Sequence, residues 1–480
     1  MNVGSLLKLF VKFSIGNWLA AGIAFLSTPL ISALIVPDEF GKASMFTLAF
    51  NFLIQIVTLG VDQSYVRRFY DKSYRDKPHE LLWNVLTPVL LCYVVVAAGA
   101  LLCWREISRF LINTEEWHIV VILAITLFVG IIERFASLYF RMSKAAGMFS
   151  VIKVAVAITN VLTVYIYCLL ADHSFYAILY GTGVSLLVGS IIGLAWQKKM
   201  WLTKAAVDWS KVRGLLAFGL PFVPAFIVGW LFEGVDKLAL KKYTDFHEIG
   251  IFSAGYRIVA ILTILQVGFS NFWTPVAYEA YESQSADNTR LFRRAFSCMS
   301  LILFICGLLT IAFKDIIILF FASDYRIAAT VMPFLVLMPI MYTLSEITVG
   351  AINFKNKSYL HLIITSVAAV SNILLNVWLV PAFGAQGAAL STGVSYILFF
   401  LTRTYLSERL LQVGFDMKTT LIALVVVILN AYVATFGIFT ALTLWACHAI
   451  SIVLLLLLYR THFIYLVGWM KNKFLGGAGS

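Results

Sequence analysis

Eight ionisable side chains lie inside stretches of the chain that are otherwise almost entirely apolar. A charged residue at the centre of a membrane-spanning helix costs about 2.5–3.5 kcal/mol, so residues of this kind mark functional sites by default. The alternative is local pairing, or a position near a helix end from which a long side chain reaches water. The eight are Asp62, Glu133, Arg134, Glu233, Asp236, Lys237, Arg257 and Glu346.

Two of these residues, Arg134 and Arg257, have the chemistry of an anion site. A guanidinium group stays charged at any physiological pH and binds phosphate oxygens through paired hydrogen bonds. Lys237 lies nearer a helix end and is a weaker candidate for the same ligand. Arg67 and Arg141 lie at inner helix ends. They are either topology anchors or further anion ligands at the inner end of such a site.

Four carboxylates could balance these cations while the site is empty. Any of them could instead carry a coupling proton if burial raised its pKa. Glu133 adjoins Arg134 but projects about 100° away around a helix, so pairing within the helix does not explain Arg134. The four carboxylates are Asp62, Glu133, Asp236 and Glu346.

A polar stripe runs along the second apolar segment. Asn51, Gln55, Thr58 and Asp62 follow one another at helical spacings of four, three and four residues. A lipid-facing helix would not carry such a row. The stripe therefore either joins neighbouring helices or lines a hydrated cavity, and we favour the cavity. Asn17 and Gln266 are weaker candidates for the same cavity.

The motifs of several common chemistries are missing from the sequence. It contains no phosphate-binding G-x-x-x-x-G-K-[ST] loop, no H-E-x-x-H zinc motif and no G-x-S-x-G nucleophile elbow. Its six cysteines are scattered without a C-x-x-C pair, so no metal site or disulfide framework is expected. No catalytic residue and no cofactor is predicted. A proton or a sodium ion is left open as a coupling ion.

The composition determines which elements must hold these residues. Of the 480 residues, 61% are hydrophobic and only 12% are charged, so the chain could not cover a soluble surface. A spanning helix needs about 20 apolar residues, and the sequence predicts an all-α integral membrane protein with about 14 transmembrane helices. The predicted spans are 11–36, 45–66, 81–103, 119–140, 149–171, 175–196, 214–236, 251–274, 297–314, 331–352, 359–380, 385–406, 419–440 and 443–463.

The net charge of +12 indicates orientation rather than a nucleic-acid partner. Lysine and arginine concentrate in alternate loops, as the positive-inside rule requires for cytoplasmic segments beside anionic lipid. With an even number of spans, both termini are predicted to be cytoplasmic. No nucleic acid is expected as a partner.

Short repeats indicate two lobes with the same orientation. Glu39 and Gly41 recur as Glu248 and Gly250, and the words 182–185 and 392–395 are both Thr-Gly-Val-Ser, at offsets of 209 and 210 residues. Parallel repeats of this kind are a known transporter plan. We expect two six-helix lobes related by a parallel pseudo-two-fold repeat, plus two C-terminal helices. The predicted parts are 1–196 (N-lobe), 197–213 (cytoplasmic inter-lobe linker), 214–410 (C-lobe) and 411–480 (last two helices and a cytoplasmic tail).

Prolines fall in corresponding helices of the two predicted lobes. Pro29 lies in the first span, and Pro221 and Pro224 lie in the seventh. A proline in a spanning helix frees backbone carbonyl groups and permits bending. We therefore place the gating bends of a transporter at these residues.

Several motifs together resemble the polysaccharide branch of the multidrug/oligosaccharidyl-lipid/polysaccharide exporter superfamily. The turn 37–41, Pro-Asp-Glu-Phe-Gly, resembles that branch's P-x-E-[FY]-G. Leu59-Gly60 running into Arg67-Arg68 resembles its second-helix ending, and 218–221, Phe-Gly-Leu-Pro, resembles its F-G-L-P. Segments 236–253 and 321–325 resemble two further motifs, and the likeness covers about residues 8–410.

This resemblance implies a Wzx-type flippase and no enzymatic activity. Such a protein moves oligosaccharide repeat units on undecaprenyl diphosphate, for O-antigen, exopolysaccharide or capsule, from the cytoplasmic to the periplasmic leaflet by alternating access. The implied location is the bacterial inner membrane, and the implied partners are the lipid-linked glycan, membrane lipids and the glycan polymerase machinery. For such a substrate, the residue chemistry described above predicts Arg257, Arg134, Lys237 and Arg67 as diphosphate ligands. A multidrug or cation antiporter of the same fold, or a lipid-II-type flippase, is the alternative.

Overall fold

The computed structural model describes residues 3–74, 77–203, 205–282, 288–355, 357, 359–437, 441–465 and 468. Over these ranges the regular structure is helical throughout, so the predicted all-α class is confirmed. The chain divides into two compact units, Met1–Gly234 and Val235–Ser480. The predicted tail at 469–480 lies outside the described residues.

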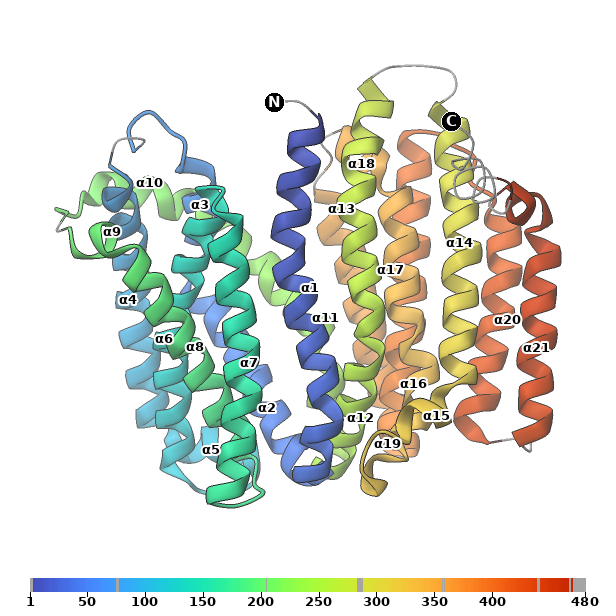
Figure 1. The fold of residues 1–480 in the computed structure, drawn as a ribbon, viewed down its shortest axis with the longest axis horizontal. Coiled ribbons are helices and arrows are strands. Elements are labelled where there is room, and N and C mark those ends of the chain that lie inside the picture. The colour runs from blue at the N-terminus through green and yellow to red at the C-terminus, as the bar shows by residue number, and fades with distance from the viewer. Residues whose placement is uncertain are drawn as a thin grey trace, which may run out of the picture. The chain divides into compact units, whose positions relative to one another are not determined.

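Unit 1 is built from long helices joined by short connections (Figure 1). Within it α7 packs against α8 and α1, and α6 packs against α8, α4 and α2. Its helices are α1 (Val3–Leu34), α2 (Pro37–Val57), α3 (Val61–Arg68), α4 (Pro78–Leu102), α5 (Trp104–Ile112), α6 (Trp117–Met142), α7 (Ala146–Leu170), α8 (Tyr176–Trp196), α9 (Lys198–Leu202), α10 (Trp209–Gly219) and the first part of α11 (Phe222–Tyr243).

Unit 2 contains the remaining helices, with α17 packed against α14 and α19, and with α20 beside α21 (Figure 1). Its helices after α11 are α12 (Phe246–Val259), α13 (Ile261–Glu282), α14 (Asn288–Ala312), α15 (Lys314–Ile318), the 3-10 turn η1 (Ser323–Tyr325), α16 (Ala328–Leu335), α17 (Leu337–Thr348), α18 (Gly350–Phe354), α19 (Tyr359–Leu410), α20 (Met417–Phe436) and α21 (Ala441–Leu458).

The predicted number of spans agrees with these helices. By length and composition, ten of the described helices could cross a membrane, and twelve could if the bent pairs α10–α11 and α12–α13 each count as one span. Helix α19 has 52 residues, and a straight helix of that length would measure about 78 Å. It is not straight, because the chain turns at Gly384, where φ is +51°. Counting its two halves separately and adding the apolar helix α21 brings the total to fourteen.

Local sequence signals start many of these helices. Pro37 and Pro78 stand at the first positions of α2 and α4, where a missing N–H costs nothing. Asp208, Asp245 and Asp416 precede α10, α12 and α20, and each side chain accepts hydrogen bonds from backbone N–H groups of the first turn.

Two helix breaks of unit 1 touch one another. Leu59 and Gly60 have positive φ values of 52° and 68°, which ends α2 and lets α3 begin. Gly219 ends α10, and a Cβ atom built on Gly60 would lie 2.2 Å from the Gly219 carbonyl oxygen. Ser64 donates a 2.6 Å hydrogen bond to the Leu215 carbonyl beside this contact. Only glycine permits this approach. The Leu59-Gly60 motif and the Phe-Gly-Leu-Pro motif at 218–221 therefore meet at one backbone contact.

The segment predicted to be an inter-lobe linker packs on unit 1. Met200 and Trp201 of α9 are buried in a cluster with residues of α3, α4 and α6. The Gln197 side chain donates to the Ala136 carbonyl at 3.0 Å, and the Asp208 N–H donates to Asn84 at 2.9 Å. The apolar residues at 200–201 account for this packing, and the role of the segment as a linker stays a prediction. The boundary between the two units falls later, within α11.

The same glutamate contact occurs in both units. In unit 1, Glu39 of α2 accepts a 2.8 Å hydrogen bond from the Phe175 N–H, at the start of α8. In unit 2, Glu248 of α12 accepts a 2.6 Å bond from the Ala385 N–H, where the second half of α19 begins. The two glutamates are the repeated residues noted above. Each satisfies an N–H group that a helix start leaves open and places a negative charge at the positive end of the helix.

We predict that Glu248→Ala lowers the melting temperature of the detergent-purified protein. The lost charge-assisted hydrogen bond stabilises the fold by about 1–2 kcal/mol. Glu248→Gln, which keeps a carbonyl acceptor, should lose less. Gly384→Ala should act in the same direction as Glu248→Ala, because its Cβ would lie 2.5 Å from the Glu248 carboxylate. Equal melting temperatures for wild type and Glu248→Ala would contradict a capping role.

Candidate functional site

A polar cavity of about 440 Å³ lies within unit 1, between α2, α3, α6, α7 and α8. Its wall combines apolar residues such as Phe50 and Ile54 with a concentration of polar and charged groups. The polar lining residues are Asn51, Asp62, Gln63, Glu133, Arg134, Ser137, Arg141 and Lys153.

The first ion pair of this cavity joins α3 to α6. Arg134 Nη2 lies 2.6 Å from Asp62 Oδ2. Asp62 stands in the first turn of α3, where the free N–H groups of a helix start favour a negative charge, and its Oδ1 also accepts from the Gln63 N–H. The Asp62 side chain is 6% exposed and that of Arg134 is 31% exposed. The carboxylate is therefore enclosed, while the guanidinium reaches the open part of the cavity.

The second ion pair joins α6 to α7. Lys153 Nζ lies 3.0 Å from Glu133 Oε1, and the Ser137 hydroxyl donates to the same oxygen at 2.6 Å. Glu133 and Arg134 thus use different partners on different helices, which agrees with their predicted directions around α6. Arg141 also lines the cavity. Three cations and two carboxylates therefore face one volume.

In unit 2, Asp236 of α11 is enclosed by neutral donors. Its side chain is buried, with the whole residue 3% exposed. Asn376 Nδ2 donates to Oδ1 at 2.8 Å and the Thr392 hydroxyl donates to Oδ2 at 2.7 Å. Asn376 also donates to Asn372 of the preceding turn at 2.9 Å. Amide and hydroxyl groups from both halves of α19 thus converge on one carboxylate of α11.

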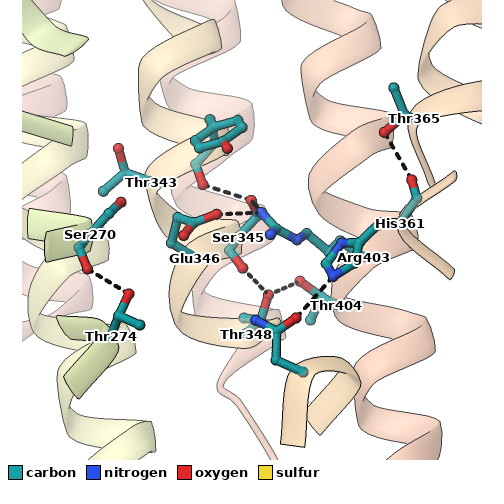
Figure 2. Close-up of polar contacts among 12 residues, drawn as sticks. Ser270, Thr274, Thr343, Ser345, Glu346, Thr348, His361, Thr365, Arg403 and Thr404 are labelled. Atoms are coloured by element: carbon teal, nitrogen blue, oxygen red, sulfur yellow. Dashed lines mark hydrogen bonds and ion pairs between the residues drawn. The ribbon is translucent and has the colours of Figure 1, made fainter. Parts of the chain in front are cut away.

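Glu346 belongs to a second cluster of unit 2, shown in Figure 2. Arg403 of α19 lies 2.8 Å from Glu346 Oε1 and donates to the Ser345 hydroxyl at 2.7 Å. Its guanidinium carbon also lies 5.7 Å from the ring centre of Tyr342 and 5.4 Å from that of Phe399. Arg403 is 6% exposed, so Glu346 is paired inside the protein.

Further hydrogen bonds in Figure 2 connect α17 and α18 to α19 around this ion pair. The hydroxyl groups of Thr348 and Thr404 lie 2.9 Å apart. His361 Nε2 lies 2.9 Å from the Asn353 side-chain oxygen. The cluster therefore holds both halves of α19 against α17 and α18.

The other predicted ligands lie on α12, α11 and α3. Arg257 lies in the last turn of α12 and is half-buried, as is Lys237 in α11. Arg67 is exposed at the end of α3. Arg257 and Arg134 belong to different units, so their joint action on one ligand remains a prediction.

The predicted cavity stripe is only partly formed. Asn51 is exposed and lines the cavity with Asp62. Thr58 does not line this cavity, since it is fully buried and its hydroxyl donates to the Ile54 carbonyl at 2.8 Å. Its hydroxyl group has a backbone partner in the preceding turn of its own helix, which lets it lie among buried neighbours. The half-buried Gln55 has an enclosed side-chain oxygen and does not line this cavity either.

The remaining predicted residues stay untested in their roles. Asn17 of α1 is exposed and Gln266 of α13 is half-buried. Helices α10 and α11 meet at 42° where Pro221 lies, with Pro224 in the first turn of α11. Pro29 lies inside α1, which continues through it.

Two charged residues of these clusters were missed from the sequence. Lys153 and Arg403 both fall inside predicted spans, at 149–171 and 385–406, but near their inner ends. A charge near a helix end can reach water. The positions of Lys153 and Arg403 therefore gave no sign that each pairs with a carboxylate. Counting every charge inside a span would have found both. In the described part of the chain, no three His, Cys, Asp or Glu side chains are grouped so as to hold a metal ion.

The arrangement of helices matches that of solved membrane transporters. A lipid II flippase, MurJ, in an inward closed conformation superposes with a TM-score of 0.71 at 14% identity, covering 94% of this chain and 99% of that one. An inward-facing multidrug resistance transporter of the MATE family, within the MOP superfamily, gives 0.62 at 14% identity over 82% and 94% of the two chains. The protein is therefore a multi-pass membrane protein with the fold of these two proteins.

The sequence matches the polysaccharide biosynthesis protein family over residues 6–281, and the chain belongs to that family. A probable low-salt glycan biosynthesis flippase of Haloferax volcanii, Agl15, is 21% identical over 235 residues, which is 48% of this chain and 50% of the relative. The match thus spans half the length of that relative. An uncharacterized membrane protein of Methanocaldococcus jannaschii is 22% identical over 440 residues and 85% of each chain.

We predict that Arg134→Ala lowers protein stability and that Asp62→Asn/Arg134→Gln restores most of it. Removing one partner leaves an enclosed carboxylate uncompensated, at a cost of about 3 kcal/mol. Two amides can instead bond to each other. Membrane abundance and melting temperature measure this effect, and a double variant no more stable than Arg134→Ala would contradict the pairing.

A matched control is the exposed pair formed by Arg68, the last residue of α3, and Asp71 in the following loop, with 2.8 Å between Nη1 and Oδ2. Here the Arg68 hydrogen bond lowers the pKa of the Asp71 carboxyl below its usual value. An exposed pair contributes little to stability, so Arg68→Gln/Asp71→Asn should leave the melting temperature nearly unchanged.

Proposed function

We propose that this protein is a flippase that moves lipid-linked oligosaccharide from the cytoplasmic to the outer leaflet by alternating access. The observation that carries the proposal is the cation-lined cavity inside the helices of a member of the polysaccharide biosynthesis protein family. The names of the flippases among its sequence and structural relatives support the same class.

The chemistry of the cavity suits a diphosphate head group. The contact with Asp62 uses Nη2 of Arg134, and a guanidinium has five N–H donors. The outer edge of Arg134 can therefore meet a phosphate while Asp62 holds the inner edge. Lys153 and Arg141 add two further positive charges to the same wall. We assign Arg257 as a second diphosphate ligand in unit 2, with Lys237 and Arg67 as weaker ones.

We place the coupling carboxylate at Asp236. A buried carboxylate with two amide side chains and a hydroxyl around it can take up a proton or offer oxygen ligands to sodium. Asp62, Glu133 and Glu346 are already engaged by cations. The described hydrogen bonds to Asp236 come from neutral groups, Asn376 and Thr392. This difference from the other three carboxylates supports Asp236 as the coupling residue.

The carrier and the setting are part of the proposal. We propose undecaprenyl diphosphate as the carrier, repeat units of the O-antigen, exopolysaccharide or capsule type as the cargo, and the bacterial inner membrane, with both termini cytoplasmic, as the location. The two sequence relatives are archaeal, so another polyprenyl carrier is the corresponding proposal for an archaeal host. The glycan polymerase machinery is the proposed protein partner.

A multidrug or cation antiporter is the second candidate, since transporters of the MATE family share the fold. A cationic drug calls for a cavity dominated by carboxylates. The unit 1 cavity holds three cations against two carboxylates, which favours an anionic cargo.

We predict that deleting the protein removes the surface glycan while lipid-linked repeat units accumulate in the cytoplasmic leaflet. Extraction and quantification of the lipid-linked fraction, with lectin staining of intact cells, measures both effects. Re-expression of the wild-type protein in the deletion strain should restore glycan export. The Asp62→Asn/Arg134→Gln variant should reach normal membrane abundance without restoring export. Persisting surface glycan in a host without a second flippase, together with altered drug sensitivity, would favour the antiporter.

A further inference from the structure

A second hollow of unit 1, of about 760 Å³, opens at the helix ends near α9. It lies between the start of α4, the α6–α7 connection and α9, and Figure 1 shows α9 at that end of the unit. It shares no lining residue with the cation-lined cavity. Its lining residues are Pro78, His79, Tyr139, Phe140, Ser143, Ala145, Trp196, Gln197, Lys198, Lys199, Met200 and Thr203.

The wall formed by α9 is fixed in place. Trp201 is 9% exposed, and its indole N–H donates to the Gln197 side-chain oxygen at 2.9 Å. Gln197 in turn donates to the Ala136 carbonyl of α6 at 3.0 Å. Because Met200 and Trp201 anchor one side of this short helix, Lys198 and Lys199 remain exposed at the hollow.

The charge of the hollow is positive. Lys198 and Lys199 contribute two positive charges, and none of the described lining residues is acidic. Glu80, which follows His79, is occupied by Lys77 at 3.0 Å and Lys211 at 3.7 Å. An anion entering the hollow therefore meets two lysines without a competing carboxylate.

The apolar part of the lining indicates a ligand that approaches from the membrane. Trp196 is 68% exposed at the end of a spanning helix, the position at which tryptophan anchors to the lipid interface. Phe140, Ala145 and Met200 complete an apolar wall beside the lysines. Basic pockets between spanning helices on the cytoplasmic side bind the head groups of anionic lipids.

We propose that this hollow binds the head group of an anionic phospholipid at the predicted cytoplasmic surface. The lysines hold the phosphate, the hydroxyl groups of Ser143 and Thr203 bond to the glycerol region, and Trp196 with Met200 contacts the first acyl carbons. The site is separate from the proposed transport cavity, and the inference holds whichever substrate is carried.

The test is the melting temperature of the detergent-purified protein with added phosphatidylglycerol or phosphatidylcholine. Phosphatidylglycerol should raise the melting temperature of wild type by about 3 °C relative to phosphatidylcholine. Lys198→Gln/Lys199→Gln removes the charge, and Ser143→Trp fills the hollow while keeping both lysines. Each variant should lose most of the shift, measured from its own lipid-free melting temperature.

The matched control is Lys241→Gln/Lys242→Gln, which neutralises another adjacent lysine pair, at the end of α11. It should keep the full shift. Native mass spectrometry of retained phosphatidylglycerol gives a second readout for any variant of low stability. The proposal is overturned if Ser143→Trp keeps the shift, if the control loses it equally, or if soluble glycerol phosphate reproduces it.

Discussion

The structure depends on one constraint: a charge enclosed among spanning helices needs an opposite charge or a set of hydrogen-bond donors close to it. Asp62 meets Arg134, Glu133 meets Lys153 and Glu346 meets Arg403, each across two different helices. The helices that carry Glu133 and Glu346 are also those most covered by protein. In their most apolar stretches, 61% and 89% of residues are buried, against 11% in α7. The two glutamates therefore lie on well-covered spans, while Lys153 reaches Glu133 from a span that is mostly uncovered.

A second constraint acts at helix ends, where backbone N–H groups have no partner in their own helix. Glu39 and Glu248 meet this need at equivalent places of the two units, which explains why the surrounding motif recurs in the sequence. The motif residues therefore identify the family through the fold they stabilise. Most residues that face the cavity belong to other positions, so the motif alone does not describe the cavity.

Helix number and class followed from the sequence because hydrophobic length alone decides them. The repeat was also visible, since its glutamates have a fixed structural task. The pairing of the charges was not visible, because a one-dimensional pattern places Asp62 and Arg134 on separate helices without saying that they touch. The burial of Thr58 was not visible either, because its spacing from Asn51 and Gln55 does not show that its hydroxyl bonds to the Ile54 carbonyl. Lys153 and Arg403 were missed because a charge near a helix end resembles an interfacial one.

The central claim is that the protein moves a lipid-linked oligosaccharide across a bilayer, and reconstitution tests it most directly. Purified protein is inserted into vesicles that contain a polyprenyl-diphosphate oligosaccharide, and an impermeant glycan-cleaving enzyme added outside reports the exposed fraction over time. The account predicts that protein-containing vesicles expose the inner pool faster than protein-free vesicles. It also predicts that added free polyprenyl diphosphate slows this exposure by competing for the cations. Equal rates with and without a folded, correctly inserted protein would contradict the claim.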